Sequence, residues 1–328
     1  MVKITNEILS RFNGQLLSPE IILLQPMVKS FFTSNSLLFL DETKLVLETG
    51  FQFGSGQLRT VRNLFNPDLI LFSHYHIDHI FGCYLFSETQ KLIHRSDQPA
   101  FLSLEDFITF CFGGSIPNND ELNNWIKHFS TFLQLESLSG WDDLGLDNHQ
   151  VFESNDPLNL GEMTLEIIHL PGHTPGHCCF YEPNSQVLFI GDFDILSKFG
   201  PWYGWRNTNL ALFRSSTETL KHFVENTEIT TIVPSHSRPV QKQECLERLI
   251  VFNKVFDKRD EQILKFITNQ KDGTTISEIA DQSFIYQGKK SDPPYVWEFF
   301  ERIHIEKHVE ELLTDGRIKK EEDQIFIN

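Results

Sequence analysis

The sequence predicts an α/β protein with helices outside layers of β-sheet, followed by a smaller C-terminal domain. Short apolar runs of strand character alternate with helical segments between about residues 30 and 240, a pattern typical of layered α/β folds. From residue 244 the pattern changes to helical spacings and a final pair of alternating segments. We therefore place the domains at residues 1–243 and 244–328, in a chain of 328 residues that is 40% hydrophobic and can bury a sizeable core.

The predicted strand at residues 69–72 is followed at once by four side chains that commonly bind metals. These are His74, His76, Asp78 and His79. Because side chains alternate along a strand, a tight turn at its end can present the first two to one point and the last two to another. A polar loop would explain one or two of them, but four at this spacing favour two metal ions side by side.

Three later strand-like runs, at residues 165–170, 187–190 and 229–233, each lead into a turn with one more candidate ligand. The turns contain His173, Asp192 and His236. Glycine and proline in such turns let the backbone approach an ion closely, while the strands hold the ligands in place. Each turn alone is a weak signal, so the recurrence at successive strand ends carries the prediction.

Residues 97–150 interrupt this pattern as a helical insertion. Apolar side chains recur at helical spacing and predict helices near residues 100–111 and 120–135. An aromatic-rich insertion of this kind can extend the core, form a dimer surface or cover the metals as a lid.

An aromatic segment at residues 199–205 lies shortly after Asp192 and contains two glycines and a proline, which forbid a regular helix. We expect Trp202, Tyr203 and Trp205 to form a substrate-binding wall. The rings could equally cap the core. A wall of such rings would suit an acyl chain or a nucleobase, so this feature does not identify the substrate.

The C-terminal segment predicts three helices and a hairpin. Residues 263–267 mark the first helix, Thr275 to Glu278 form a capping box that opens the second, and residues 295–313 form the third. Residues 317–320 and 324–327 alternate as a hairpin does. Residues 259–328 contain ten Lys or Arg against fifteen Asp or Glu, a net charge of −5, which disfavours nucleic-acid binding and favours packing or dimerisation.

These motifs resemble the metallo-β-lactamase-fold hydrolases, including the glyoxalase II-like and LACTB2-like proteins, over about residues 30–240. The resemblance implies an αββα four-layer sandwich, an opening hairpin at residues 35–40 and 44–50, and a winged-helix-like C-terminal domain. It places His74, His76 and His173 on a first metal and Asp78, His79 and His236 on a second, with Asp192 bridging both. Glu48 and His177 are expected to support the ligands, and Glu48 departs from the usual Asp.

The ligand types suit two divalent ions, most readily Zn²⁺, although Fe or Mn fit the same donors. With Asp78 and Asp192 as catalytic residues, metal-bound hydroxide would attack a thioester or ester carbonyl. The resemblance leaves two alternatives open. One is a LACTB2-like single-strand endoribonuclease, and the other is an iron oxygenase resembling the persulfide dioxygenases, with His74, His173 and Asp192 as its triad.

The remaining features predict a cytoplasmic enzyme that acts on a small molecule. No run approaches the roughly 20 apolar residues of a membrane span, and the N-terminus lacks the pattern of a secretion signal. The five cysteines are odd in number and are expected to be buried apolar residues. The net charge of −17 again disfavours nucleic acid, and a homodimer is possible.

Overall fold

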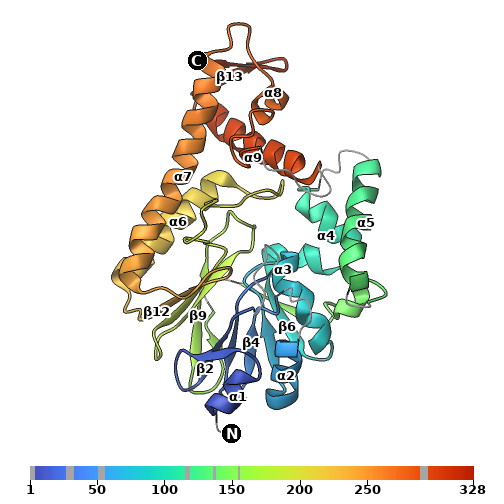
Figure 1. Ribbon diagram of the computed structural model, residues 1–328, viewed down its shortest axis with the longest axis vertical. Coiled ribbons are helices and arrows are strands. Elements are labelled where there is room, and N and C mark those ends of the chain that lie inside the picture. The colour runs from blue at the N-terminus through green and yellow to red at the C-terminus, as the bar shows by residue number, and fades with distance from the viewer. Residues whose placement is uncertain are drawn as a thin grey trace.

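Two β-sheets stacked face to face form the centre of the protein, as the computed structural model shows (Figure 1). The structure describes residues 4–26, 33–50, 56–114, 119–135, 138–153, 156–288 and 295–328. The first sheet runs in chain order from β1 to β7, and its strands are β1 (Gly14–Leu16), β2 (Ile21–Leu24), β3 (Ser36–Phe39), β4 (Leu45–Leu47), β5 (Leu69–Leu71), β6 (Gln90–His94) and β7 (His149–Phe152). Strands β1 to β4 pair antiparallel and β4 to β7 pair parallel.

The second sheet has the order β12-β11-β10-β9-β8. Its strands are β8 (Leu158–Asn159), β9 (Thr164–His169), β10 (Cys178–Glu182), β11 (Val187–Gly191) and β12 (Thr231–Pro234). Only β11 and β12 pair in parallel, and α6 (Leu210–Asn226) connects them.

Alternation along the strands divides the core into layers. Leu37, Leu47 and Leu71 face the second sheet, where they join Phe180 and Phe189 in one buried cluster. Their chain neighbours point the other way and pack under α2 (Gly56–Phe65). The outer face of the second sheet packs in the same manner under α6 and α7 (Lys242–Thr268). The expected αββα sandwich is therefore confirmed, including the hairpin, in which Leu37 of β3 lies opposite Leu47 of β4.

Both predicted helices of the insertion are present, as α4 (Leu104–Cys111) and α5 (Asn119–Leu135). The 3-10 segments η2 (Arg95–Phe101) and η3 (Trp141–Leu144) flank them. The ring of Phe107 packs against Phe129 at 5.1 Å between centroids and against Trp141 at 4.9 Å. The insertion therefore contributes to the core and also reaches the C-terminal segment, since Trp125 contacts Phe300 at 5.9 Å.

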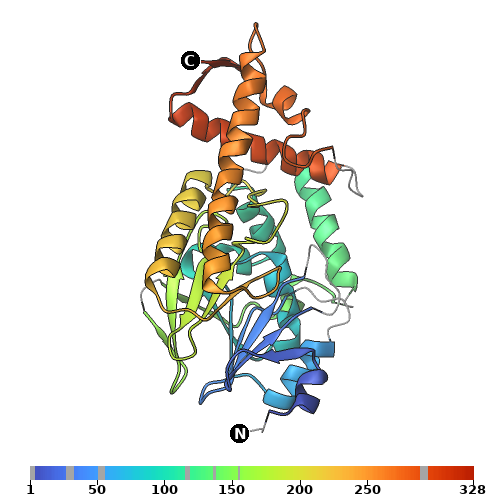
Figure 2. The ribbon, with the colours of Figure 1, turned by 60° about the vertical axis from the view of Figure 1, so that its left-hand side comes forward.

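One continuous helix joins the two predicted domains. The first half of α7 buries Leu249 and Phe252 against the second sheet, and its last turns bury Ile263 and Ile267 among the C-terminal elements. Figure 2 shows this helix, in orange, running from the sheet to the C-terminal end of the molecule. The boundary predicted at residue 243 thus falls at the start of a helix that both parts share.

The C-terminal elements match the predicted pattern. They are α8 (Ile276–Ala280), α9 (Tyr295–Thr314) and an antiparallel hairpin of β13 (Ile318–Glu321) and β14 (Gln324–Ile327). The capping box forms, with Thr275 accepting from the Glu278 amide at 3.2 Å and Glu278 accepting from the Thr275 amide at 2.8 Å.

Outside these elements, two further expectations concern the whole chain. All five cysteines are buried, and none forms a disulfide. Among the helices of the described residues, none has the length and apolar character needed to cross a membrane.

Candidate metal centre

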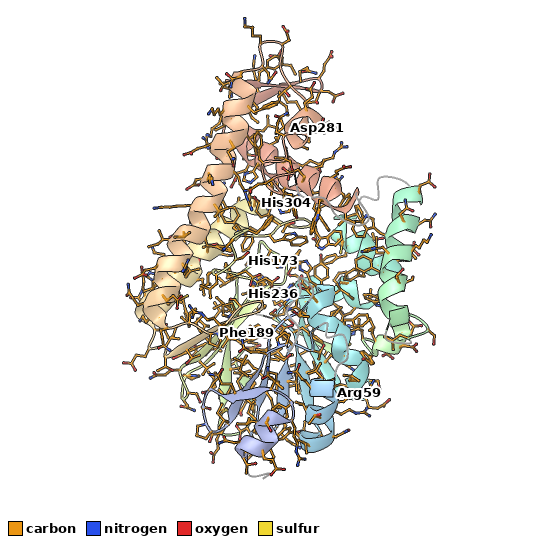
Figure 3. The ribbon with its side chains drawn as sticks, viewed as in Figure 1. Arg59, His173, Phe189, His236, Asp281 and His304 are labelled. Atoms are coloured by element: carbon orange, nitrogen blue, oxygen red, sulfur yellow. The ribbon has the colours of Figure 1, made fainter. Side chains whose placement is uncertain are left out.

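The seven ligand-type residues predicted from the sequence converge at one end of the sandwich, where four strands finish. They follow β5, β9, β11 and β12, and the α3 helix (Ile77–Ile80) carries two of them. Figure 3 places His173 and His236 between the sheets and the C-terminal helices. Because strand ends hold the backbone, the side chains reach this point with little freedom.

Three histidines and one carboxylate oxygen form the first group. The Oδ2 atom of Asp192 lies 3.1 Å from His173 Nε2 and 3.7 Å from His74 Nε2. His76 completes the group, with its Nδ1 atom 3.0 Å from His173 Nε2. Ligand atoms about 2 Å from one ion lie roughly 3–3.5 Å apart, so this group could hold a metal ion.

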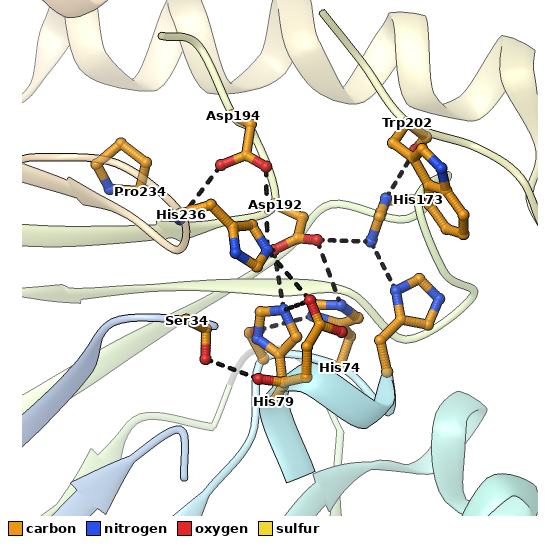
Figure 4. A network of polar contacts seen from close by, with 12 residues as sticks. Ser34, His74, His79, His173, Asp192, Asp194, Trp202, Pro234 and His236 are labelled. Atoms are coloured by element: carbon orange, nitrogen blue, oxygen red, sulfur yellow. Dashed lines mark hydrogen bonds and ion pairs between the residues drawn. The ribbon is translucent and has the colours of Figure 1, made fainter. Parts of the chain in front are cut away.

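The other oxygen of Asp192 faces the second group (Figure 4). Its Oδ1 atom lies 3.1 Å from His79 Nε2 and 3.2 Å from His236 Nε2. Asp78 Oδ2 lies 3.6 Å and 3.4 Å from the same two nitrogens. Asp78, His79 and His236 could also hold a metal ion, and Asp192 offers one oxygen to each group.

Four of the histidines have their Nδ1 atoms fixed by a neighbouring oxygen. The partners are Ser73 Oγ for His74 (2.9 Å), Glu48 Oε2 for His79 (3.0 Å), the Trp202 carbonyl for His173 (3.0 Å) and the Thr33 carbonyl for His236 (2.9 Å). A ring that donates from Nδ1 leaves the lone pair of Nε2 free, and this is the arrangement that metal-binding histidines use. All four Nε2 atoms point toward Asp192.

Several polar atoms at the centre of the cluster are buried and lack a hydrogen-bond partner among the described residues. They are Nε2 of His74 and His79 and Oδ1 of Asp192. An unsatisfied buried polar atom costs about 1–3 kcal/mol, and three in one place are unusual without a ligand. The donor set and its orphaned atoms therefore fit divalent metal ions, which the fold also implies.

The electrostatics of the cluster favour positive charge near the carboxylates. Burial would raise the pKa of Asp192, but His79, His236 and their neighbours hold it well below its ordinary value. Burial opposes a charge on His236, yet Asp194 and Asp192 raise its pKa to about 10. Burial lowers the pKa of His74 and His76, which keeps both imidazoles neutral and able to donate a lone pair.

Glu48 supports the second group, although it is longer than the usual Asp. One oxygen binds His79, and the other accepts the backbone N–H of Ser73 at 2.7 Å. The backbone of Glu48 adopts a φ of 65°, which is uncommon for a residue with a side chain. The carboxylate of Glu48 thus joins His79 to the backbone at the end of β5.

His177 lies behind the centre rather than in it. Its Nε2 atom accepts the backbone N–H of Asp192 at 3.1 Å, and burial lowers its pKa to about 3. The same ring would lie 2.3 Å from a Cβ at Gly191, whose φ is 56°. Only glycine fits at this position, so His177 and Gly191 together set the backbone that presents Asp192.

Asp97 and Asp194 are polar residues of the site that the sequence motifs did not reveal. Asp97 is buried in η2 and accepts hydrogen bonds from Thr174 Oγ1 and the Gly176 amide, both at 2.7 Å, which holds the turn that carries His173. Asp194 accepts from the His236 amide at 3.3 Å. The Asp-x-Asp spacing with Asp192 could have indicated Asp194, whereas nothing local marks Asp97.

The aromatic loop divides into two parts. Trp202 and Trp205 line a cavity of about 450 Å³ that opens onto His76 and Asp192, together with side chains of the insertion and the C-terminal segment. Tyr203 is fully buried and points away, toward His308 and Arg259. The prediction that Tyr203 belongs to the substrate wall is therefore wrong, because its ring is buried against the C-terminal helices while Trp202 and Trp205 face the cavity.

The fold and the site together define an α/β sandwich enzyme with two adjoining His/Asp groups suited to divalent metal ions. Residues 30–236 match the metallo-beta-lactamase superfamily, and this segment is well over half of the chain. The chain belongs to that superfamily.

Three of the relatives that are similar to the chain match it at low identity over about half of its length or more. The acyl-coenzyme A thioesterase MBLAC2 of Bos taurus is 23% identical over 213 residues, which span 60% of this chain and 70% of the relative. The human MBLAC2 is 21% identical over 172 residues, spanning 52% and 56%. The probable metallo-hydrolase YybB of Bacillus subtilis is 26% identical over 155 residues, spanning 47% and 58%. The matches to the human and Bacillus proteins thus cover less than two thirds of those relatives.

Solved structures share the fold across nearly the whole chain. The metallo-beta-lactamase family protein TTHA1429 of Thermus thermophilus superposes with a TM-score of 0.68 at 18% identity, covering 95% of this chain and all of that one. A beta-lactamase domain protein of Burkholderia ambifaria gives 0.67 at 15% identity, covering 96% and 93%. The shared architecture therefore extends into the C-terminal elements.

Proposed function

We propose that this protein is a dinuclear metal-dependent hydrolase of acyl thioesters or related esters. The observation that carries the proposal is the position of Asp192, whose two oxygens face two separate ligand groups. In this proposal His74, His76 and His173 would hold one ion, Asp78, His79 and His236 would hold the other, and Asp192 would contribute to both. When bound, such a pair of ions lowers the pKa of a shared water and polarises a carbonyl oxygen.

Residues around the site hold the proposed ligands in the orientation that this chemistry needs. The hydrogen bonds at Nδ1 orient His79, His173 and His236 before a metal arrives, so little reorganisation accompanies binding. His177 fixes the backbone of Asp192, and the cavity lined by Trp202 and Trp205 can exclude water from a bound substrate. The thioesterase names of the MBLAC2 relatives support the choice of an acyl thioester.

The test begins with metal content and turnover. Wild-type protein should contain two equivalents of divalent metal and hydrolyse an acyl thioester equally well with and without oxygen. A chelator should abolish turnover, and Zn²⁺ or Mn²⁺ should restore it. Asp78→Ala should reduce the metal content toward one equivalent and remove most turnover, whereas Asp323→Ala, at a highly exposed position, should change neither.

Three outcomes would contradict the proposal. Asp78→Ala protein with two metals and normal turnover would exclude the dinuclear assignment. Oxygen uptake restored by Fe²⁺ alone would favour a mononuclear oxygenase. Cleavage of single-stranded RNA without thioester turnover would favour an endoribonuclease.

His177→Ala should keep both ions, because His177 contacts the backbone of Asp192 rather than an ion position.

A further inference from the structure

The cavity beside the metal centre is walled by aromatic rings from three segments that lie far apart in the sequence. Phe107, Trp125 and Phe129 come from the insertion, and Trp202 and Trp205 come from the loop after β11. The C-terminal segment supplies the remaining rings, among them Tyr286, Trp297 and Phe300. We call this space the aromatic cavity. Its volume of about 450 Å³ lies within the usual range of small-molecule sites.

The rings form a continuous packed wall rather than isolated contacts. Trp205 packs on Trp125 at 5.3 Å and on Phe300 at 5.2 Å between ring centroids. Trp202 packs on Phe300 at 5.4 Å, and its indole N–H donates to Tyr286 Oη at 3.0 Å. Because these contacts hold the wall in shape, the cavity is formed before any ligand enters.

One end of the aromatic cavity reaches the proposed ligands. The ring of Trp202 lies 5.6 Å from His76 and 6.0 Å from His173, and Asp78, Asp192 and His236 also line the cavity. A group bound among the rings therefore lies next to the position where a carbonyl would be attacked.

Charge distinguishes between the two kinds of occupant that aromatic walls can bind. Among the described residues that line the cavity there is no Lys or Arg, and the carboxylates are Asp78, Asp192 and Asp194. A nucleotide needs cations along its phosphates, and this lining does not supply them away from the metals. An uncharged apolar group needs none and gains free energy from each methylene that it buries.

We propose that the aromatic cavity is the binding site for the apolar acyl group of the substrate, so that the enzyme selects medium- or long-chain acyl thioesters over acetyl thioesters. This inference rests on the proposed function for its reaction, but the binding site can be tested without turnover. The insertion and the C-terminal segment then determine specificity, since each contributes part of the wall.

Binding can be followed by the fluorescence of the tryptophans that line the cavity, with uncharged 1-alkanols as probes. The affinity should rise roughly fourfold for each added methylene until the chain fills the cavity. Val296→Phe projects a ring into the lining and should weaken 1-decanol binding at least tenfold, whereas Val251→Phe, at a 55% exposed position of α7, should leave it unchanged.

Turnover of N-acetylcysteamine thioesters gives the second measurement. Val296→Phe should lower kcat/KM for the decanoyl thioester at least tenfold and lower kcat/KM for the acetyl thioester by a much smaller factor. Phe300→Ala should also weaken decanol binding, whereas Phe266→Ala, a matched change outside the cavity, should not. Cavity-dependent decanol binding without turnover of any thioester would uphold the apolar site and reject the proposed reaction.

Three results would overturn the inference. Thioester turnover that is independent of chain length would uphold the reaction and reject the acyl site. Equal losses for acetyl and decanoyl thioesters in Val296→Phe would show that the substitution acts on the centre rather than on an acyl site. Displacement of decanol by a single-stranded oligonucleotide, lost in Val296→Phe, would assign the cavity to a nucleobase.

Discussion

Several histidines that point into the candidate metal centre are oriented by a neighbouring oxygen at Nδ1. His79 is oriented by Glu48, which is in turn fixed by the Ser73 amide, and His236 is oriented by the Thr33 carbonyl. Asn35 donates to the carbonyls of Pro234 and Ser237 at 2.8 Å and 2.7 Å and thereby ties the turn that carries His236 to the first sheet. Loss of such a supporting hydrogen bond commonly weakens metal binding about 10- to 100-fold.

Glu48→Gln should weaken the binding of the second metal ion about 10- to 100-fold, because one amide oxygen cannot accept from both His79 and Ser73. Titration of metal-free protein with Zn²⁺ against a chromophoric chelator measures this affinity. Glu166→Gln changes an exposed residue of β9 in the same way and should leave both affinities unaltered. An unchanged second affinity in Glu48→Gln would show that His79 needs no such support.

Asp97 predicts a pH dependence of stability. Burial raises the pKa of Asp97 to about 7 from the ordinary value of 3.8, despite hydrogen bonds from Thr174 and Gly176. Between about pH 4 and pH 7 the folded protein therefore retains a proton that the unfolded chain has lost. This contribution to the free energy of unfolding is complete below pH 4 and is lost as the pH rises through 7.

Asp97→Asn removes that titration. The stability advantage of wild type over Asp97→Asn, measured by chemical denaturation at fixed metal content, should shrink steadily from pH 4 to pH 8. Asp272→Asn, at an exposed position, should show no such trend. A difference between wild type and Asp97→Asn that stays constant across this interval would mean that Asp97 is ionised in the fold at every pH tested.

At the scale of elements, the C-terminal helices hold the loop that orients His173. Arg259 of α7 donates to the carbonyls of Phe199 and Pro201 and to Tyr203 Oη, each at 2.8 Å. His304 of α9 accepts the Tyr203 amide at 3.3 Å. Because the neighbouring Trp202 carbonyl accepts from His173, these contacts connect the C-terminal segment to the metal centre.

Tyr203→Phe should lower the free energy of unfolding by about 1–3 kcal/mol, because it leaves His308 and Arg259 without their shared partner in a buried network. It should also weaken the first metal site, since the loop that orients His173 loses an anchor. Thermal unfolding and Zn²⁺ titration measure the two effects. Tyr181→Phe removes a hydroxyl that donates to the Glu228 carbonyl elsewhere and should reduce stability alone. If Tyr203→Phe lowers stability without changing the metal affinity, the hydrogen bonds of Tyr203 do not influence the metal site.

The sequence predicts the proposed ligands better than the residues that support them, for a physical reason. Ligands occur in short motifs at strand ends, so spacing and strand patterns suffice to find His74 or Asp192. Asp97, Arg259 and His308 are single polar residues of helical segments, and their partners lie far along the chain. Only the packed fold brings them together. The error at Tyr203 arose in the same way, since composition alone cannot show which face of a loop is buried.

At the scale of the whole molecule, the C-terminal segment is part of the enzyme rather than an attached module. Its rings complete the aromatic cavity, and α7 packs on both the second sheet and α9. The buried cluster on the outer side of the first sheet continues through the insertion to α9 and the terminal hairpin. Removal of the C-terminal segment should therefore affect the stability of the fold more than any other property.

A chain that stops after residue 244 should fail to fold, because removing α7 uncovers the outer face of the second sheet. Leu249, Phe252 and Phe256 would no longer cover that face, and each fully buried side chain of this kind contributes about 1.5–3 kcal/mol. Their sum approaches the whole stability of a typical domain, about 5–15 kcal/mol. Circular dichroism and the soluble fraction of expressed protein report this outcome.

Two further truncations make this prediction specific. A chain that stops after residue 268 keeps α7 but removes Tyr286 and Phe300 from the cavity, so it should fold poorly and bind no decanol. A chain that stops after residue 316 lacks only the hairpin and should retain its metals and decanol binding with reduced stability. Since residues 259–328 carry a net charge of −5, the affinity for single-stranded RNA should be weak in every form. A soluble, active chain of 244 residues that loses only tight, salt-dependent RNA binding would show instead that the segment is a separate nucleic-acid module.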